Sequence, residues 1–218
     1  MSWKVDCVVV GPIQCNCYIL HDPVSLKAFL IDPGAESEDL LVHLQQRKFD
    51  LQAILVTHGH LDHVGGIEMV LEEFPCPVYY HSADKPLYDN LLMQAQLFGM
   101  TPRQLQARQP KAGEGALQHE QTFPMEGAEL QVIHTPGHTP GSVCFQMTGE
   151  KKVVFSGDTL FEGSIGRTDL WGGSYDQIIQ SIQERLMVLE DTVMILPGHG
   201  AETMIGAERR YNPFLVTP

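Results

Sequence analysis

Twice along the chain, an apolar segment ends in an acidic residue, a helical segment follows, and a second apolar segment ends in a histidine. The first copy runs from residues 30–32, ending in Asp32, to residues 54–58, ending in His58. The second runs from residues 154–158, ending in Asp158, to residues 195–199, ending in His199. Strands joined through a crossover helix run parallel, so their carboxyl ends lie at one edge of a sheet. The repeat therefore predicts an α/β fold in which two βα layers meet with polar residues along one rim.

Apolar runs and turn residues predict the other elements. Strands are expected at residues 5–10, 17–20, 27–31, 52–57, 77–81, 128–133, 142–147, 152–156 and 192–196, the first two as a hairpin. Helices are expected at residues 37–47, from the histidines near residue 60 through Phe74, at 85–98 and at 175–189. Ser174-x-x-Gln177 is a capping box for the last of these, and Thr101-Pro102 is a possible short-helix start. No linker or composition break divides the chain, so we expect one domain over residues 1–218.

The charge and cysteine content limit the partners of this protein. Lys plus Arg number 14 against 27 Asp plus Glu, a formal charge of −13 at pH 7, which argues against binding to nucleic acid or to anionic membranes. The first residues do not have a basic segment followed by an apolar one, and no apolar run approaches the ~18 residues needed to span a bilayer, so we expect neither a targeting leader nor a membrane span. The five cysteines are scattered and mostly lie in apolar segments, which predicts reduced core thiols of a cytoplasmic protein. For Cys15 and Cys17, strand packing is favoured over metal binding.

Histidines and aspartates gather in loops that follow apolar segments. The members of this set are His58, His60, Asp62, His63, His138, Asp158 and His199. Alternate residues of an extended segment share a face, so His58 and His60 can bind one ion together, while the following helix turns Asp62 and His63 towards a second position. Imidazole and carboxylate ligands suit Zn, Fe or Mn, and two ions ~3.5–4 Å apart need a bridging oxygen, for which Asp158 is the natural candidate.

The remaining histidines have less specific positions. His134 closes a strand four residues before His138, and a packed or supporting imidazole is at least as good an interpretation as a metal ligand. The others are interpreted as structural: His21, His43, His81 and His119.

Five motifs together resemble those of the metallo-β-lactamase superfamily. In chain order they are Asp32-Pro33-Gly34, Thr57-His58-Gly59-His60-Leu61-Asp62-His63, Thr135-Pro136-Gly137-His138-Thr139-Pro140-Gly141-Ser142, Ser156-Gly157-Asp158 and Pro197-Gly198-His199-Gly200. The chain is most similar to the short, single-domain bacterial type II glyoxalases. This resemblance implies a four-layer αβ/βα sandwich with metals at the sheet edge. It also implies that His58, His60 and His138 hold one ion, that Asp62, His63 and His199 hold the other, and that Asp158 bridges them.

The resemblance also orders the candidate activities. Asp158 at the bridging position argues against an antibiotic hydrolase, and the −13 charge with no added C-terminal domain argues against a nuclease. The expected activity is binuclear thioester hydrolysis, most simply of S-lactoylglutathione to glutathione and lactate, with Zn preferred over Fe or Mn. The alternatives are a mononuclear-iron persulfide dioxygenase, because the loop at residues 166–169 is similar to a motif in both families, and a metal-binding protein without catalysis.

Four further expectations concern residues around the metals. Asp62 is expected to orient the attacking water as well as to bind metal. Asp32 either accepts a hydrogen bond from a ligand histidine or is a simple turn residue. Arg167 either contacts substrate or pairs with Asp169 as an internal clamp, which we favour. The glutathione moiety would meet only basic residues of the polar stretch at residues 83–115, which are Lys85, Arg103, Arg108 and Lys111.

Overall fold

The computed structural model describes residues 3–97, 115–149 and 152–216. The chain forms two compact units, Met1–Ala116 and Leu117–Pro218, and each is described by itself. None of the described helices combines the length and the apolar character needed to cross a membrane. The expected helix start at Thr101-Pro102, and the basic residues Arg103, Arg108 and Lys111, lie outside the described residues.

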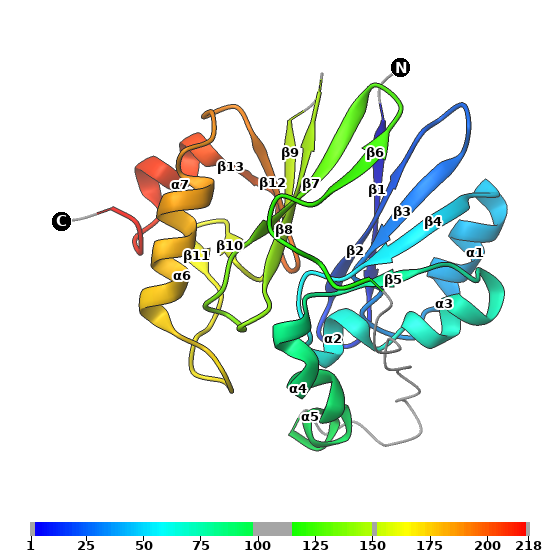
Figure 1. Ribbon diagram of the computed structural model, residues 1–218, viewed down its shortest axis with the longest axis horizontal. Helices are drawn as coiled ribbons and strands as arrows, with labels where there is room; N and C mark the ends of the chain where they lie inside the picture. Colours follow the sequence, from blue (N-terminus) through cyan, green and yellow to red (C-terminus); the bar gives the residue numbers. More distant parts are fainter. Residues whose placement is uncertain (1–2, 98–114, 150–151, 217–218) are drawn as a thin grey trace. The chain divides into compact units, whose positions relative to one another are not determined.

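The first unit is built on a five-stranded sheet in the order β1-β2-β3-β4-β5 (Figure 1). Its strands are β1 (Lys4–Val10), β2 (Cys15–His21), β3 (Lys27–Ile31), β4 (Asp50–Leu55) and β5 (Val78–Tyr79). β1, β2 and β3 pair antiparallel, whereas β3, β4 and β5 run parallel. The predicted hairpin between β1 and β2 is confirmed, and its turn places Gly11 at φ +71°, which favours glycine.

Short helices accompany this sheet. They are α1 (Glu38–Arg47), α2 (Leu61–Val64), α3 (Ile67–Glu73), the 3₁₀ helix η1 (Ser82–Asp84), α4 (Lys85–Asp89) and α5 (Leu91–Leu97). The helix predicted from the histidines to Phe74 is interrupted between α2 and α3. At that point the Gly66 N–H donates to the Pro33 carbonyl oxygen at 2.7 Å, so the hydrogen-bond pattern of α2 does not continue into α3. The helix predicted over residues 85–98 is likewise divided, at Asn90.

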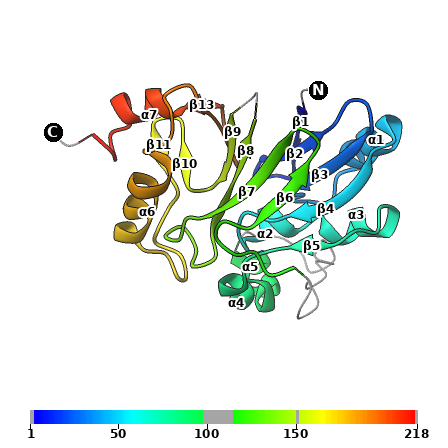
Figure 2. The same cartoon turned by 45° about the horizontal axis from the view of Figure 1, so that its top comes forward.

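One apolar cluster joins the helices to the sheet. Ile19, Leu30 and Ile54 from the strands lie in the same cluster as Leu44 of α1 and Val70 of α3, and all five are fully or almost fully buried. Figures 1 and 2 show α1 and α3 on the same side of β3 and β4. The crossover from β3 through α1 to β4 is thereby fixed by packing.

The second unit is built on a six-stranded sheet in the order β13-β12-β9-β8-β7-β6. Its strands are β6 (Thr122–Met125), β7 (Ala128–His134), β8 (Val143–Thr148), β9 (Val153–Gly157), β12 (Met194–Pro197) and β13 (Thr203–Met204), with a separate hairpin of β10 (Leu160–Phe161) and β11 (Ser164–Ile165). β9 and β12 run parallel and the other neighbours antiparallel. The short strands β6, β10, β11 and β13 were not predicted.

The helices of the second unit are α6 (Tyr175–Ser181), a π-helical segment η3 (Ile182–Leu186) and α7 (Ile205–Tyr211). Ser174 caps α6, because its hydroxyl oxygen accepts a hydrogen bond from the Gln177 N–H at 3.4 Å, as the capping box predicts. Ile178 and Ile182 pack with Val154 and Ile195 of the strands in one buried cluster. The predicted helix over 175–189 thus starts correctly but changes to π geometry after Ser181 and ends near Met187. Helix α7 was not predicted.

The repeated arrangement seen in the sequence is confirmed within each unit. β3–α1–β4 is a crossover between parallel strands that ends with Asp32 after one strand and His58 after the other. β9, α6 and β12 form the corresponding crossover, which ends with Asp158 and His199. In both cases, the polar residues follow the carboxyl ends of parallel strands, where α/β sheets present their ligand sites.

Candidate metal centre

The loop after β4 brings two imidazoles together. His58 and His60 are buried, with Nε2 of His58 3.0 Å from Nδ1 of His60 and their rings nearly perpendicular at 85°. Two nitrogens bound to one tetrahedral zinc ion lie about 3.3 Å apart, because each Zn–N distance is about 2.0–2.1 Å. We call His58 and His60 the histidine claw. Its geometry fits two ligands of one divalent ion.

His63 and Asp62 follow on α2, at the start of which the chain changes direction. The His63 ring is fully buried and its centroid lies 4.0 Å from that of His58. Nε2 of His63 lies 3.9 Å from Oδ2 of Asp62, too far for a hydrogen bond. The helix turn therefore places an imidazole nitrogen and a carboxylate oxygen near one another, as the sequence predicts.

Asp32 is the hydrogen-bonding centre of this loop. Its Oδ1 accepts a hydrogen bond from the Thr57 N–H at 2.8 Å, and its Oδ2 accepts one from the Thr57 hydroxyl at 2.6 Å. Oδ2 also lies 2.9 Å from Nδ1 of His63. A buried carboxylate at this distance makes Nδ1 the protonated nitrogen, which leaves the lone pair of Nε2 available to a metal ion. Of the two interpretations of Asp32, the structure supports the contact with His63, although the residue also adopts the turn conformation with φ +52°.

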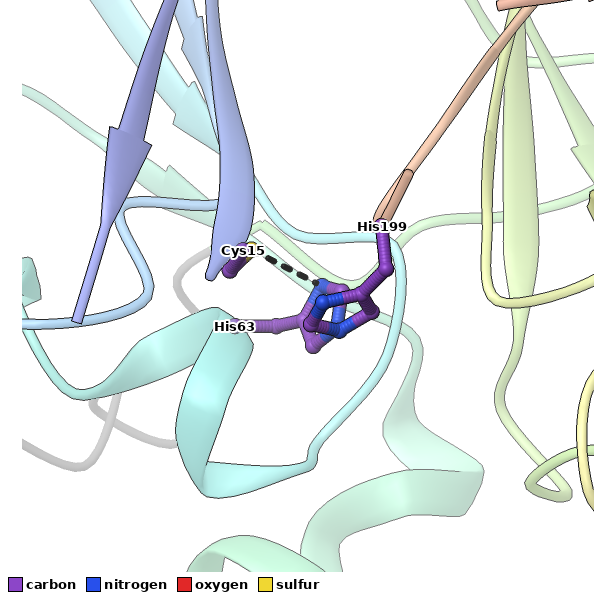
Figure 3. A group of neighbouring side chains, drawn as sticks. All are labelled: Cys15, His63 and His199. Atoms are coloured by element: carbon purple, nitrogen blue, oxygen red, sulfur yellow. Dashed lines mark hydrogen bonds between the residues drawn. The ribbon is translucent and has the colours of Figure 1, made fainter. Parts of the chain in front are cut away.

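Cys15 lies beside the same histidine without the character of a reactive thiol. Figure 3 shows its sulfur facing the His63 ring, with Sγ 3.7 Å from Nδ1. Burial raises the pKa of Cys15 to about 11, so the thiol stays protonated at neutral pH. Cys15 and Cys17 are buried in β2, as predicted from strand packing. The prediction of core placement is wrong for Cys7, which is exposed because it alternates with Val8 and Val10, the residues of β1 that face the core.

Two buried polar residues that support the loop were missed from the sequence. Asp84 Oδ2 accepts a hydrogen bond from the Gly59 N–H at 2.8 Å, and Gln94 bonds the backbone on both sides of His60. The available signal was the position of Gln94 three residues after Leu91, which places the two side chains on the same apolar face of their helix.

In the second unit, one carboxylate oxygen faces two imidazoles. Oδ2 of Asp158 lies 3.7 Å from Nε2 of His138 and 3.8 Å from Nε2 of His199. Both gaps are too long for hydrogen bonds. A nitrogen and an oxygen bound to one zinc ion lie roughly 3.4 Å apart in tetrahedral geometry and roughly 4.1 Å apart in linear geometry, and both gaps fall within this range. The donor set and spacing fit a carboxylate that shares metal ions with two histidines.

The loop after β11 orients His138. Nδ1 of His138 lies 2.7 Å from the Arg167 carbonyl oxygen, which makes Nδ1 the donor and directs Nε2 towards Asp158. Arg167 forms a bidentate pair with Asp169 at 2.7 Å for both bonds, so the predicted internal pairing is confirmed. That hydrogen bonding lowers the pKa of Asp169 to about 2 and raises that of Arg167. Both side chains are largely exposed, so the pair contributes little to stability.

The motif around His138 is held by its own small polar residues. The Thr139 N–H donates to the Ser142 hydroxyl at 3.0 Å, and the two hydroxyls lie 2.8 Å apart. Gly137 has φ +138°, and a Cβ atom there would lie 2.2 Å from the Ile178 nitrogen, so α6 can approach only a glycine. His134 Nε2 lies 3.0 Å from the Pro140 carbonyl oxygen, which identifies His134 as a supporting residue of this loop.

Helix α7 supports the hairpin that leads into the Arg167 loop. The buried Glu208 accepts hydrogen bonds from the Gly163 N–H at 2.9 Å and from the Thr203 hydroxyl at 2.6 Å. Asn212 Nδ2 donates to Glu208 at 2.7 Å and to the Ser164 carbonyl oxygen at 3.0 Å. These residues were not among the predicted site residues, since the hairpin residues that they contact, Gly163 and Ser164, are 45 and 48 positions away in sequence.

The four histidines interpreted as structural each contact a neighbouring side chain or backbone group. His21 is buried with its ring centroid 4.7 Å from that of Phe49, and His43 Nε2 lies 2.9 Å from Asp6. His81 Nδ1 accepts a hydrogen bond from the N–H of Ala83, where it caps η1. His119 contacts the Arg185 guanidinium.

Comparison with known proteins identifies the family. The sequence model of the metallo-beta-lactamase superfamily matches residues 10–199. The chain belongs to this superfamily. Its α/β fold is the metallo-β-lactamase fold, as the resemblance predicted. The superfamily match, the name of a Bacillus subtilis relative (probable metallo-hydrolase YqgX, 35% identical over 215 residues) and the histidines gathered in the loops identify the chain as a metal-binding hydrolase.

Among its relatives, the uncharacterized protein ML0493 of Mycobacterium leprae is 42% identical over 212 residues, with 94% of this chain and 95% of the relative covered. Hydroxyacylglutathione hydrolase GloC of Haemophilus influenzae is 39% identical over 213 residues, with 97% and 98% covered.

Two solved structures have the same fold over nearly the whole chain. The BLEG-1 B3 metallo-beta-lactamase superposes with a TM-score of 0.85 at 35% identity, covering 98% of this chain and 100% of that one. TTHA1623 in a di-iron-bound form superposes with a TM-score of 0.81 at 38% identity, covering 96% and 100%.

Proposed function

We propose that the protein is a binuclear metal-dependent thioester hydrolase whose substrate is S-lactoylglutathione or a similar small thioester. The observation that carries the proposal is the position of Asp158, where one carboxylate oxygen lies nearly equidistant from two imidazole nitrogens, at 3.7 and 3.8 Å. The 39% identity to the hydroxyacylglutathione hydrolase of Haemophilus influenzae supports the substrate class.

In this proposal, the seven side chains predicted from the sequence are the ligands of two ions. His58, His60 and His138 hold one ion, Asp62, His63 and His199 hold the second, and Asp158 binds both. The support for these ligands is of two kinds. His58 and His60 have their nitrogens 3.0 Å apart. His63 and His138 each have Nδ1 close to an oxygen, which leaves Nε2 of each ring available to a metal ion.

When bound, the two ions would make water nucleophilic at neutral pH and polarise the thioester carbonyl. The chain contributes orientation and charge. Asp62, whose side chain is only partly exposed, is proposed to orient the attacking water as well as to bind metal. Asp158 supplies the negative charge that lowers the repulsion between the two cations. A thiolate is a good leaving group, so the reaction needs no strong general acid.

The glutathione moiety is proposed to bind weakly at a solvated rim. Of the four basic residues that could meet its carboxylates, Lys85 is the described one, and it pairs with Asp89 at 2.7 Å while more than half exposed. Exposed pairs of this kind contribute only about 0–1 kcal/mol each and weaken with salt. Such binding favours several small thioesters over one dedicated substrate.

The metal, location and partners are proposed from the sequence. Zinc is preferred because the proposed ligands are imidazole and carboxylate groups. Iron comes next, because TTHA1623 was solved in a di-iron-bound form. Manganese is also compatible with these ligands. A charge of −13 supports a small-molecule hydrolase that binds neither nucleic acid nor membranes. The free thiols support a cytoplasmic location.

Three assays on one sample, purified without added metal, test the function. We expect hydrolysis of S-lactoylglutathione, no oxygen uptake with glutathione persulfide, and β-lactam cleavage that is slower by orders of magnitude. The β-lactam assay is needed because a B3 metallo-beta-lactamase shares the fold at 35% identity. Oxygen uptake without thioester hydrolysis would replace the proposal by a persulfide dioxygenase, and β-lactam cleavage faster than thioester cleavage would replace it by an antibiotic hydrolase.

A further inference from the structure

The backbone of the histidine claw is held from outside its own loop. Asp84 Oδ2 accepts a hydrogen bond from the Gly59 N–H at 2.8 Å. Gln94 Nε2 donates to the Gly59 carbonyl oxygen at 3.2 Å, and Gln94 Oε1 accepts from the Leu61 N–H at 2.9 Å. Each of the three consecutive peptide units between His58 and Leu61 therefore has a hydrogen bond to Asp84 or Gln94.

Gln94 is suited to this position by its amide group. Besides its two bonds to the loop, Nε2 donates to the Leu87 carbonyl oxygen at 2.9 Å. Both amide protons and the amide oxygen are thus engaged, and the side chain is buried. Asp84 is buried as well. Buried polar groups with satisfied partners are rigid, because breaking any one bond leaves a group unsatisfied away from water.

We propose that Asp84 and Gln94 are positioning residues that set the metal affinity of the histidine claw. The inference rests on the proposed metal-dependent function. The claw nitrogens lie 3.0 Å apart, and their separation depends on the backbone torsions between the two histidines. Fixing all three peptide units keeps both imidazoles aimed at one point before an ion arrives, so less conformational freedom is lost on binding. Removal of supporting partners of this kind weakens metal binding about 10–100-fold.

Zn²⁺ binding in competition with a chromophoric chelator measures the effect directly, without any assay of activity. Gln94→Met keeps the length and apolar stem of the side chain but removes its three hydrogen bonds. We expect it to weaken Zn²⁺ binding about 10–100-fold. Gln96→Met is the matched control, because Gln96 lies on the exposed face of the same helix, and its affinity should stay within twofold of the parent.

Two variants of Asp84 test the hydrogen bond that this residue accepts from the Gly59 N–H. Asp84→Asn retains an oxygen that can accept from Gly59, so its Zn²⁺ affinity should stay close to that of the parent. Asp84→Leu keeps the branching at Cγ but has no acceptor, and it should lose affinity about 10-fold or more. A residue with only a structural role would lower the melting temperature of the metal-free protein in both Leu and Met variants without changing the Zn²⁺ affinity.

Zn²⁺ affinity within twofold of the parent in a folded Gln94→Met protein would overturn the proposal. If Gln94→Met does not fold, amide hydrogen exchange in the metal-free parent decides instead. The Gly59 and Leu61 amides should exchange at least 100-fold more slowly than exposed amides, and exchange at the unprotected rate would overturn the proposal. A parent protein that binds Zn²⁺ normally while the variants do not differ refutes only this inference, whereas a parent without Zn²⁺ binding refutes the proposed function.

Discussion

Asp32→Asn should move the ring proton of His63 from Nδ1 to Nε2 and thereby remove a metal ligand. Asp32 accepts three hydrogen bonds with two oxygens, from the Thr57 N–H, the Thr57 hydroxyl and His63 Nδ1, at 2.6–2.9 Å. Asparagine has one oxygen. If that oxygen stays with the Thr57 N–H, the amide NH₂ faces His63 and is compatible only with an unprotonated Nδ1, so the proton moves to Nε2. Both asparagine and aspartate tolerate the φ of +52° at this position, so the backbone is not disturbed.

The magnitude follows from the two ways in which the amide can be placed. With the tautomer exchanged, metal affinity should fall about 10–100-fold, equivalent to about 1.4–2.7 kcal/mol. If the asparagine side chain is flipped, so that its oxygen faces His63 and its NH₂ faces Thr57, the buried Thr57 N–H is left without an acceptor. The free energy of unfolding then falls by about 1–3 kcal/mol. In the first case, thioesterase activity should decrease by at least tenfold at limiting metal, whereas in the second case the loss appears as a lower melting temperature.

NMR of the imidazole nitrogens, metal analysis and thioesterase kinetics on one preparation provide the assay. Asp39→Asn is the control, because Asp39 is exposed on α1 and its substitution should change none of these quantities. Retention of the Nδ1 proton on His63 together with two metals per chain, full activity and an unchanged melting temperature in Asp32→Asn would refute the role assigned to Asp32.

Three further predictions concern the second unit and the substrate. Asp158→Ala should lose both metal occupancy and activity, because two cations would then repel each other without a shared carboxylate; two metals per chain by elemental analysis with near-normal turnover would contradict this. The Asp169 carboxylate, whose pKa is lowered to about 2 by Arg167, should stay ionised in NMR titrations down to about pH 3. The stabilisation from this pair should be present above about pH 4 and lost as the pH falls towards 2, and Arg167→Gln should return the pKa of Asp169 towards about 3.9. KM for S-lactoylglutathione should be high and should rise with salt, while kcat should change little for a truncated thioester; a low KM that is indifferent to salt would reveal a dedicated glutathione site.

Local sequence patterns predicted the elements that carry most of the site. Asp32, His58, Asp158 and His199 follow apolar strands, and strand ends are visible in the sequence because apolar runs stop at polar or glycine-rich turns. The spacing of His58 and His60 also predicted that their rings would meet, and the structure places their nitrogens 3.0 Å apart. Such features depend on only a few neighbouring residues.

Features that depend on distant parts of the chain were not predictable in this way. The interruption before α3 follows from the hydrogen bond of the Gly66 N–H to the distant Pro33 carbonyl oxygen, which periodicity does not show. Glu208 looks like an ordinary charged residue of a helix, yet it is buried and bonded to Gly163, 45 positions away. Strands of two residues, such as β10 and β11, are too short to have a period. Gln94 has its role only because the loop after β4 packs beside its helix.

The most direct test of the proposed function is a titration of the metal-free protein with Zn²⁺, with bound metal and thioesterase activity measured at each step. Activity on S-lactoylglutathione should rise steeply only as occupancy passes from one ion to two per chain, because the proposed ligand set holds two ions that share Asp158. Full activity at one ion per chain, or two bound ions without thioester hydrolysis, would contradict the proposed binuclear thioester hydrolase.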